Sequence, residues 1–250
     1  MLLKVDLLSN GSVNFKKNTH RFCGRATLLQ FFREFGPEYS AKLQFVCSDM
    51  WAPYLKVIAK KAPQALNILD RFHIMRKFNE AIDEIRRGEA KSFKANNQVN
   101  VLEKGRWLLL KRKENLSEKQ TSRLGDLMKL NLSSIKAYML REDFQQFWCY
   151  QRYDFADKFL ENWVTRTLKT NLDPMKKVAK MLRSHKPMIL NWFKVKAKGR
   201  LSSGAVEDMN LKAKLTIRKA YGFKTIKHLQ VALYHTLGNL PEPMCNQKFC

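Results

Sequence analysis

The chain has 250 residues, 45% of them hydrophobic, and a formal net charge of +25 with a pI near 10.0. This length can bury a full hydrophobic core, as one large domain or as two. The excess of positive charge favours a polyanionic partner, above all nucleic acid. No segment approaches the ~18 uninterrupted apolar residues that a membrane-spanning helix needs, so we expect no membrane partner.

The five cysteines are scattered along the chain, and no two of them have the CxxC spacing. The sequence therefore gives no sign of a zinc ribbon or a thioredoxin-like site. An odd, scattered set is typical of reduced thiols in a cytosolic protein. The first residues do not form a signal peptide, because Lys4 and Asp6 interrupt the apolar run. We expect a cytoplasmic protein.

The first third of the chain reads as alternating strands and helices. Two β-leaning segments, at about 2–8 and 13–16, flank Asn10-Gly11, which is a strong hairpin turn signal. A helix over about 26–36, a strand over 43–48, a helix with Pro53 in its first turn and a strand over 65–69 complete the order β-β-α-β-α-β. Strand-helix-strand units predict right-handed crossovers and a parallel sheet.

From about residue 74 the apolar period changes from two to 3.6, which predicts helices almost throughout 74–200. The expected elements are a helix from 74 to Arg87-Gly88, a helix after a capping box at 117–120 and a helix over 132–150. The helical pattern continues from Phe155 to about 170, and a helix with Asp173 as its N-cap ends near 190. A final helix is predicted from about 204 to the stop at 221–223, and a short one over 225–237.

Each of the two strands that follow the hairpin ends on an aspartate. Asp49 follows the strand 43–48, and Asp70 follows the strand 65–69. Ligands of open parallel sheets sit at the carboxyl ends of the strands, and on neighbouring strands the two side chains would start about 5 Å apart. A third acid, Glu207, opens a basic helix. Carboxylates suit Mg²⁺ or Mn²⁺, so the pattern points to metal-assisted phosphodiester chemistry, which generally needs three or more acids.

Each acid also has a purely structural explanation. Asp49 could cap the helix that follows it, and Asp70 could pair with Arg71 or cap the helix beyond residue 73. Glu207 is favoured in a first helical turn by the helix dipole. His73 could bind metal, position water or contact phosphate, and a structural role for it is equally open.

The helix that begins near Glu207 has a polar face next to an apolar stripe. Asn210, Lys214 and Arg218 lie at i+3, i+7 and i+11 from Glu207, on one face. This arrangement suits a metal ligand at the start of the helix, with Asn210 beside the site, followed by phosphate contacts from Lys214 and Arg218. A solvated charged face is the alternative interpretation.

Two further basic segments are candidates for DNA contact. Segment 104–113 places Trp107 among the cations Arg106, Lys111 and Arg112, which suits phosphate contact with base stacking. Equally, Trp107 and the leucines after it could belong to the core, with the cations solvated. Segment 194–200 predicts a DNA-facing basic loop, and its candidate cations are Lys196, Lys198 and Arg200.

Several segments resemble the DDE transposases of the ISL-three-type bacterial insertion sequences, over roughly residues 26–237. The similar segments are 46–54 (VCSDMWAPY), 69–73 (LDRFH), 79–87 (NEAIDEIRR), 106–112 (RWLLLKR), 114–117 (ENLS), 203–210 (SGAVEDMN) and 220–223 (AYGF). As a set these motifs are highly specific. The first resembles the second-acid segment of the family, and SGAVEDMN resembles its third-acid motif.

The resemblance implies an α/β fold with a ribonuclease-H-like core and a large all-helical insertion before the last catalytic helix. It also implies DNA cleavage and strand transfer at transposon ends with Mg²⁺ or Mn²⁺, by a protein bound to DNA at the bacterial nucleoid as a single copy or as a homo-oligomer. By motif, Asp49 is the second catalytic acid and metal ligand, and Glu207 the third. Asp70, His73 and Asn210 would be auxiliary residues near the site, and both transposon-end and target DNA would be partners.

We expect three parts: 1–73 as the hairpin and two strand-helix units of the core, 74–200 as the helical insertion, and 201–240 as the final helices that close the core. In the family the first acid lies on a first strand upstream of the hairpin. This chain begins at what looks like the second strand, and Asp6 aligns better with a hairpin aspartate. We therefore expect an incomplete core without the first strand, from a 5′-truncated gene.

Three functional hypotheses follow from this reading. The first is a DDE transposase domain, or an inactive remnant of one. The second is a non-catalytic basic DNA-binding protein derived from a transposase. The third is an unproductive fragment that folds poorly without its central strand. Catalytic activity is therefore an open question in the sequence alone.

Overall fold

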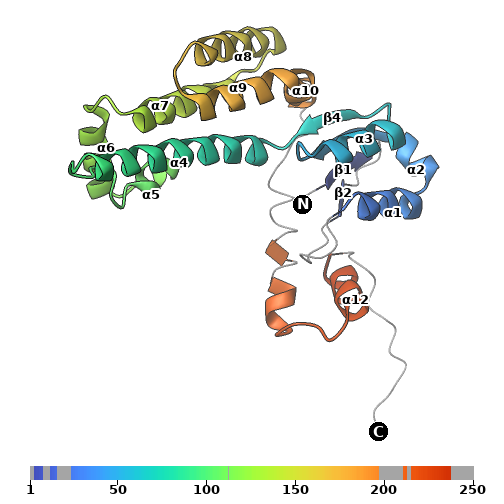
Figure 1. The fold of residues 1–250 in the computed structure, drawn as a ribbon. Helices are drawn as coiled ribbons and strands as arrows, with labels where there is room; N and C mark the ends of the chain where they lie inside the picture. The colour runs from blue at the N-terminus through green and yellow to red at the C-terminus, as the bar shows by residue number, and fades with distance from the viewer. Residues whose placement is uncertain are drawn as a thin grey trace. The chain divides into compact units, whose positions relative to one another are not determined.

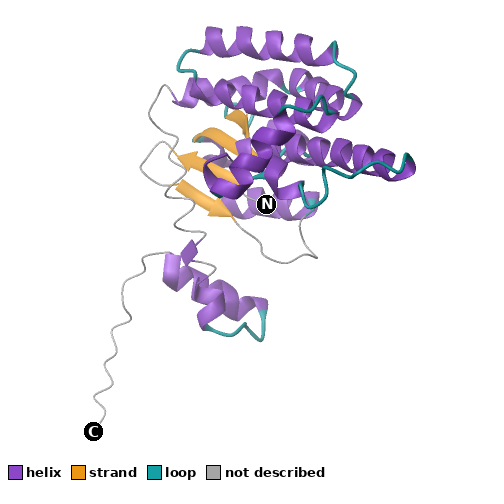
Figure 2. Cartoon of the chain, turned by 90° about the vertical axis from the view of Figure 1, so that its left-hand side faces the viewer, coloured by secondary structure: helices purple, strands orange, loops and turns teal. Residues whose placement is uncertain are grey.

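A computed structural model of the chain describes residues 3–7, 12–15, 24–111, 113–196, 211–212 and 215–237. The chain divides into two compact units, Met1–Lys198 and Gly199–Cys250. Most of the described residues are helical, and the strands gather in one small sheet (Figure 1, Figure 2).

The sheet of the first unit has four strands in the order β2-β1-β3-β4. The strands are β1 Leu3–Leu7, β2 Ser12–Phe15, β3 Leu43–Ser48 and β4 Leu66–Leu69. The predicted hairpin is confirmed, since β1 and β2 pair antiparallel. The predicted parallel arrangement holds for β3 and β4, but β1 pairs antiparallel with β3. The sheet is therefore mixed, because the hairpin attaches directly to β3.

Three helices accompany the strands of this sheet; two of them were predicted, and the short helix after Gly36 was not. They are α1 Arg25–Phe35, α2 Pro37–Ala41 and α3 Ala52–Lys61. Gly36 ends α1 with a φ of 81°, a left-handed conformation that glycine adopts without steric cost. Phe32 of α1 and Ile58 of α3 pack with Val46 of β3 in one buried cluster. Burial on the sheet therefore fixes where β3 ends and α3 begins.

Helix α4, Arg71–Ala95, leads from the sheet into the helical part of the unit (Figure 1). It begins three residues earlier than predicted because Asp70 caps it, accepting a hydrogen bond from the amide of Phe72. The predicted stop at Gly88 is wrong, since the helix continues to Ala95. A glycine inside a helix costs only about 1 kcal/mol relative to alanine, and Phe93 beyond it still packs against the helical core.

The remaining elements of the first unit are all helical. They are α5 Arg106–Leu110, η1 Lys113–Asn115, α6 Glu118–Met128, α7 Ser133–Gln145, η2 Gln146–Cys149, α8 Tyr153–Leu168, α9 Asp173–Ser184 and α10 Lys186–Lys196. The capping box at the start of α6 is confirmed, with Ser117 and Gln120 exchanging hydrogen bonds. The helix predicted over 132–150 is confirmed in the main, as α7 followed by the short 3₁₀ turn η2.

The sequence pattern misplaces two boundaries near α9. The helix predicted to run from 173 to about 190 is two helices, α9 and α10, which meet at His185. The expected N-cap at Asp173 is also wrong: Leu172 is the capping residue, and Asp173 is already the first residue of the helix. At this position the negative charge of Asp173 interacts favourably with the positive end of the helix dipole, although its side chain does not cap the helix.

An aromatic cluster holds the helical part together. Phe144 lies 4.7 Å from Phe78 and 5.0 Å from Trp163, measured between ring centroids, and Phe147 lies 5.1 Å from Phe193. All five rings are buried, so α4, α7, η2, α8 and α10 share one core. Edge-to-face and offset pairs of this kind add to the hydrophobic gain of burial.

Helix α10 connects this helical core to the sheet. The side-chain amide Nδ2 of Asn191 donates to the main-chain carbonyl of Asn67 at 2.9 Å. The carbonyl belongs to β4, and the hydrogen bond spans 124 positions of sequence. The last strand of the sheet is therefore joined to the final helix of the helical part.

The second unit contributes helical residues at 211–212 and 215–219, a turn, and helix α12 Ile226–Leu237. The predicted stop is confirmed, since Tyr221 and Gly222 have φ of 49° and 106° and end the first helix. The amide of Tyr221 donates to the carbonyl of Arg218 at 3.1 Å. The predicted start of that helix, near residue 204, lies outside the described residues.

Candidate catalytic edge of the sheet

The two candidate aspartates follow paired positions of neighbouring parallel strands. Ser48 lies opposite Leu69 in the β3–β4 ladder, and the amide of Asp70 donates to the carbonyl of Ser48 at 2.9 Å. Asp49 directly follows Ser48 at the end of β3, and Asp70 directly follows Leu69 at the end of β4. The side-chain hydroxyl of Ser48, which is fully buried, also lies 3.1 Å from Oδ1 of Asn67. The end of β3 is thus tied to β4 by both main chain and side chain.

Asp49 is half-buried between β3 and α3. Its Oδ1 accepts the main-chain amide of Trp51 at 3.1 Å. The capping residue of α3 is Trp51 and not Asp49. The Asp49 carboxylate therefore stabilises the turn that precedes the helix. Asx turns of this kind position an acidic side chain without consuming both oxygens. Within the described part of the chain, Oδ2 of Asp49 has no hydrogen-bond partner.

Both carboxylate oxygens of Asp70 have partners. Its Oδ1 accepts the amide of Phe72 at 2.9 Å, which makes it the N-cap of α4. Its Oδ2 lies 2.9 Å from Nδ1 of His73, and both side chains are mostly buried. The capping role that the sequence left open is therefore found, together with a pairing to His73. Arg71 is turned elsewhere, over the ring of Trp148 at 5.2 Å and toward Gln145.

The donor chemistry at this edge suits a hard divalent cation, since both strand ends present carboxylate oxygens. Among the residues that the structure describes, there is no group of three or more His, Cys, Asp or Glu side chains placed to hold a metal ion. Glu207 and Asn210 lie outside the described residues. Asp49 and Asp70 follow paired positions at one edge of the sheet, with His73 beside Asp70.

The basic segment at α5 divides into a buried and an exposed part. Leu108 and Leu109 are buried in the helical core, whereas Trp107 is 57% exposed. The guanidinium of Arg106 lies over the Trp107 ring at 5.2 Å from its centroid, and its Nε is 3.9 Å from Asp83. The leucines are therefore core residues, whereas Trp107 and Arg106 are exposed and form a stacked indole and cation.

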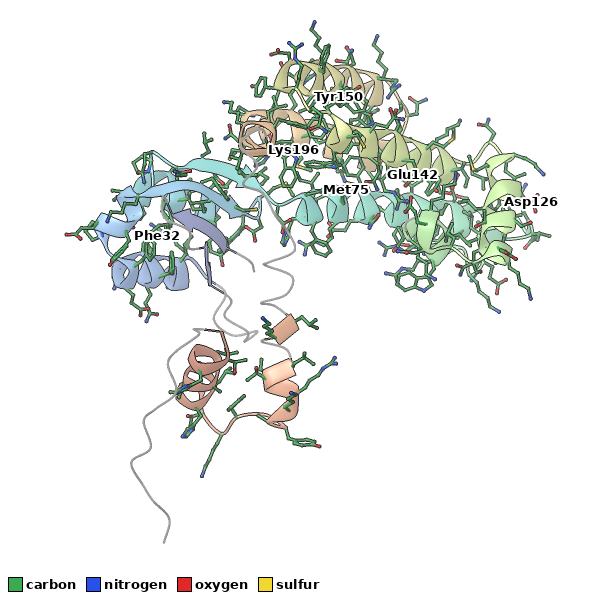
Figure 3. All side chains as sticks on the ribbon, turned by 180° about the vertical axis from the view of Figure 1, so that it is seen from behind. Phe32, Met75, Asp126, Glu142, Tyr150 and Lys196 are labelled. Carbon is green, nitrogen blue, oxygen red and sulfur yellow. The ribbon has the colours of Figure 1, made fainter. Side chains whose placement is uncertain are left out.

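The other candidate cations have varied surroundings. Lys111 is half-buried, and Arg218 is exposed in the second unit. Lys196 donates through Nζ to the carbonyls of Trp148, at 3.4 Å, and Tyr150, at 3.1 Å (Figure 3). Its ammonium group therefore has partners inside the protein already. The remaining candidates lie outside the described residues: Arg112, Lys198, Arg200 and Lys214.

Sequence reasoning missed the residue that fixes the α5 segment. Arg141 of α7 is only 3% exposed, and its guanidinium donates to the carbonyls of Leu109 and Lys111 at 2.7 and 3.3 Å. It also donates to Asn79 at 2.9 Å and pairs with Glu142 at 2.7 Å. A lone arginine in an amphipathic helix gives no sign of burial, so no pattern could have identified it.

Comparison with known proteins places the chain among mobile-element proteins. A transposase family model, for the DDE transposases of ISL3 type, matches residues 23–233. The transposase for insertion sequence element IS1001 of Bordetella parapertussis is 28% identical over 202 residues, which cover 80% of this chain and 49% of the relative. The transposase for insertion sequence element IS1557 of Mycobacterium tuberculosis is 23% identical over 240 residues, covering 87% and 53%.

The chain thus spans about half the length of the curated relatives it matches. No solved structure matches it significantly. Among the residues that the structure describes, none of the helices combines the length and apolarity that crossing a membrane requires. The family match covers most of the chain and includes both strand-end aspartates. This chain belongs to the DDE transposase family of ISL3 type.

Proposed function

We propose that the chain acts as the DDE domain of a transposase, which cleaves DNA and transfers strands at insertion-sequence ends with the help of Mg²⁺ or Mn²⁺. The observation that carries the proposal is the placement of Asp49 at the carboxyl end of β3, in register with Asp70 on β4, in a chain of this family. The proposed fold of this part is ribonuclease-H-like.

In this proposal Asp49 and Glu207 are the acids that hold the metal. Such an ion, when bound, activates a nucleophile and stabilises the leaving oxygen of a phosphodiester. Asp49 suits the role because one of its oxygens braces the turn to Trp51 while the other has no partner among the described residues. Asp70 and His73 would support the site from the neighbouring strand, as an oriented pair.

The charge of the chain supports DNA as the partner. A net charge of +25 would draw the protein to a polyanion, and exposed cations such as Arg106 and Arg218 are available for phosphate contact. DNA of the transposon ends and target DNA are the proposed substrates, bound by one or more copies of the chain. The nucleoid is then the proposed place of action.

The test is a nicking assay on labelled insertion-sequence-end DNA with the full chain and Mn²⁺ or Mg²⁺. We expect Asp49→Asn and Glu207→Gln to abolish metal-dependent nicking while DNA affinity stays within about twofold. Asp126→Asn is the matched control, since this carboxylate on α6 is 71% exposed, pairs with Lys129 and lies far from the sheet (Figure 3). Nicking that survives in both acid variants would overturn the proposal.

The alternative function is a basic DNA-binding protein without catalytic activity. The observation that favours it concerns the acidic residues at the sheet edge. Among the described residues, Asp49, Asp70 and His73 are not arranged as a group of three side chains that could hold a metal ion. The same assay separates the two functions. Tight, salt-sensitive DNA binding without nicking in Mn²⁺, unchanged by Asp49→Asn and Glu207→Gln, would support the binding protein.

A further inference from the structure

The two strand-end aspartates share a feature that the family resemblance does not explain. Each carboxylate accepts the main-chain amide of an aromatic residue two positions further on. Asp49 Oδ1 accepts from Trp51 at 3.1 Å, and Asp70 Oδ1 accepts from Phe72 at 2.9 Å. Because the two aspartates follow paired positions of β3 and β4, the same acid-x-aromatic unit occurs twice at one edge of the sheet.

Both aromatic side chains are unusually exposed. Trp51 is 44% exposed and Phe72 is 67% exposed, although tryptophan and phenylalanine are normally among the more buried residues. Each ring is oriented by one perpendicular neighbour. Trp51 lies 4.5 Å from Tyr54 at 90°, and Phe72 lies 5.6 Å from His73 at 89°, between ring centroids. The rings are therefore held in place while much of their surface stays in contact with solvent.

The surroundings of the Trp51 and Phe72 rings indicate which kind of ligand would contact them. Each ring belongs to a residue whose main-chain amide is bound by a carboxylate, and charged residues are depleted at the apolar core of a protein interface. The chain as a whole is strongly cationic, which favours a nucleic acid ligand. Aromatic side chains stack on bases whose faces are open, and in duplex DNA those faces are covered by neighbouring base pairs. Unpaired bases therefore fit this surface better than a duplex.

We propose that Trp51 and Phe72 form a stacking pair for unpaired bases of DNA, placed by Asp49 and Asp70 next to the scissile phosphodiester bond. The inference rests on the proposed function for the location of that bond. It adds a substrate preference: DNA that is frayed or single-stranded beside the cleavage position. The acid-to-amide hydrogen bonds make the position of the rings depend on the same carboxylates that face the substrate.

The experiment measures DNA affinity in the presence of EDTA, so that it does not depend on catalysis. The full chain is titrated into a single-stranded oligonucleotide and a duplex of the same sequence, each carrying 2-aminopurine. We expect Trp51→Ala with Phe72→Ala to weaken single-strand binding about tenfold or more, and duplex binding less than twofold. The 2-aminopurine quenching seen with the wild-type chain and the single strand should be lost.

Conservative and distant variants complete the test. Trp51→Phe with Phe72→Tyr keeps two aromatic faces and should restore single-strand affinity, whereas Trp51→Leu with Phe72→Leu keeps apolar side chains and should not. Phe155→Ala is the matched control, because Phe155 is 49% exposed on α8. The slope of log affinity against log salt should be the same in all variants, since stacking releases no counterions.

Three results would overturn the inference: equal losses on single strand and duplex, leucine variants that bind as well as wild type, or unchanged 2-aminopurine quenching in the alanine variants. A lowered melting temperature with unchanged affinity would instead assign the rings to contact with another segment of this chain, and would also overturn it. Failure of the proposed function appears elsewhere, as nicking that does not depend on Asp49, so the two outcomes are distinguishable.

Discussion

Oδ2 of Asp70 lies 2.9 Å from Nδ1 of His73, while its Oδ1 accepts the amide of Phe72 at the same distance. Both oxygens of this carboxylate are therefore engaged within α4. Among the described residues, Asp49, which follows the paired position of β3, engages only one oxygen, with Trp51. Two acids at equivalent places in the sheet thus have different freedom to bind a ligand. We infer that Asp70 contributes mainly to structure and orientation, and Asp49 to metal binding.

Substitution of Asp70 should separate its capping role from its charge. Asp70→Ala removes the cap of α4 and should lower the free energy of unfolding by about 1 kcal/mol. Asp70→Asn keeps an acceptor for the amide of Phe72 and should lie close to wild type. Urea denaturation of both variants measures the difference. If asparagine destabilises as much as alanine, the pairing with His73, and not the cap, supplies the stability.

Two cations from the predicted DNA-binding set should behave differently. Arg106 is exposed, whereas Lys196 donates to the carbonyls of Trp148 and Tyr150. Arg106→Gln should reduce the slope of log affinity against log salt by about 0.9, the value for one lost phosphate contact on duplex DNA. Lys196→Gln should lower the melting temperature and leave the slope unchanged. Fluorescence anisotropy at several salt concentrations, beside thermal melts, would show the reverse pattern if our assignment is wrong.

The sequence predicted the elements best where a strong local signal coincides with burial. The strand over 43–48, the proline in the first turn of α3 and the capping box at Ser117 all combine a local preference with an apolar stripe, and the structure contains each of them. The paired positions of Asp49 and Asp70 followed from the same signals, because consecutive strand-helix-strand units place carboxyl ends side by side.

Other features depended on tertiary contacts that no local pattern contains. The pairing of β1 with β3 is a long-range choice of partner, and the buried Arg141 donates to carbonyls 32 and 30 positions away. The basic stretch after residue 194 predicted a loop, yet Lys196 ends a helix and is bound internally. The exposure of Trp51 and Phe72 was not foreseen either, since aromatic residues in a helical pattern are ordinarily core residues.

The continuation of α4 through Gly88 gives a prediction with a matched control. A methyl group at Gly88 would meet no atom within 4 Å, so Gly88→Ala should raise the free energy of unfolding by about 0.5–1 kcal/mol. Gly36 also has open space, but its φ is 81°, so Gly36→Ala should be destabilising. Urea denaturation checks both signs. A destabilised Gly88→Ala would mean that α4 is not continuous in solution.

Two groups in the helical part predict a loss of stability at alkaline pH. The pKa of Lys186 is raised, first by its hydrogen bond to Asp157, and burial raises the pKa of the Tyr138 phenol. For both groups the folded state holds the proton more tightly, so their contribution is complete below about pH 10 and is lost as pH rises through the folded pKa. Lys186→Gln and Tyr138→Phe should each flatten the fall in melting temperature between pH 9 and pH 11, roughly the range in which these groups titrate. Lys129→Gln, which alters an exposed pair with Asp126, should follow the wild-type curve.

The buried guanidinium of Arg141 donates to the carbonyls of Leu109 and Lys111, close in sequence to the exposed Arg106 and Trp107, so we expect it to affect both stability and the proposed DNA binding. Arg141→Met leaves those carbonyls and Glu142 without their donor, and the loss of a buried charged partner should cost about 3 kcal/mol or more. Arg141→Lys keeps the charge but not the planar fork of donors, so it should recover only part of the stability.

The same change should weaken DNA binding through α5 even under conditions where the variant is folded. We expect Arg141→Lys to resemble Arg106→Gln in its salt slope, since a displaced α5 no longer presents its cation. Arg152→Lys is the control, because Arg152 pairs with Asp154 on the surface, where both side chains are about 70% exposed, and little should change. Hydrogen exchange should localise the effect, with faster exchange of the amides of 106–111 and unchanged protection in α8. Uniform loss of protection across all helices would mean that Arg141 supports the helical core as a whole, and not the α5 surface in particular.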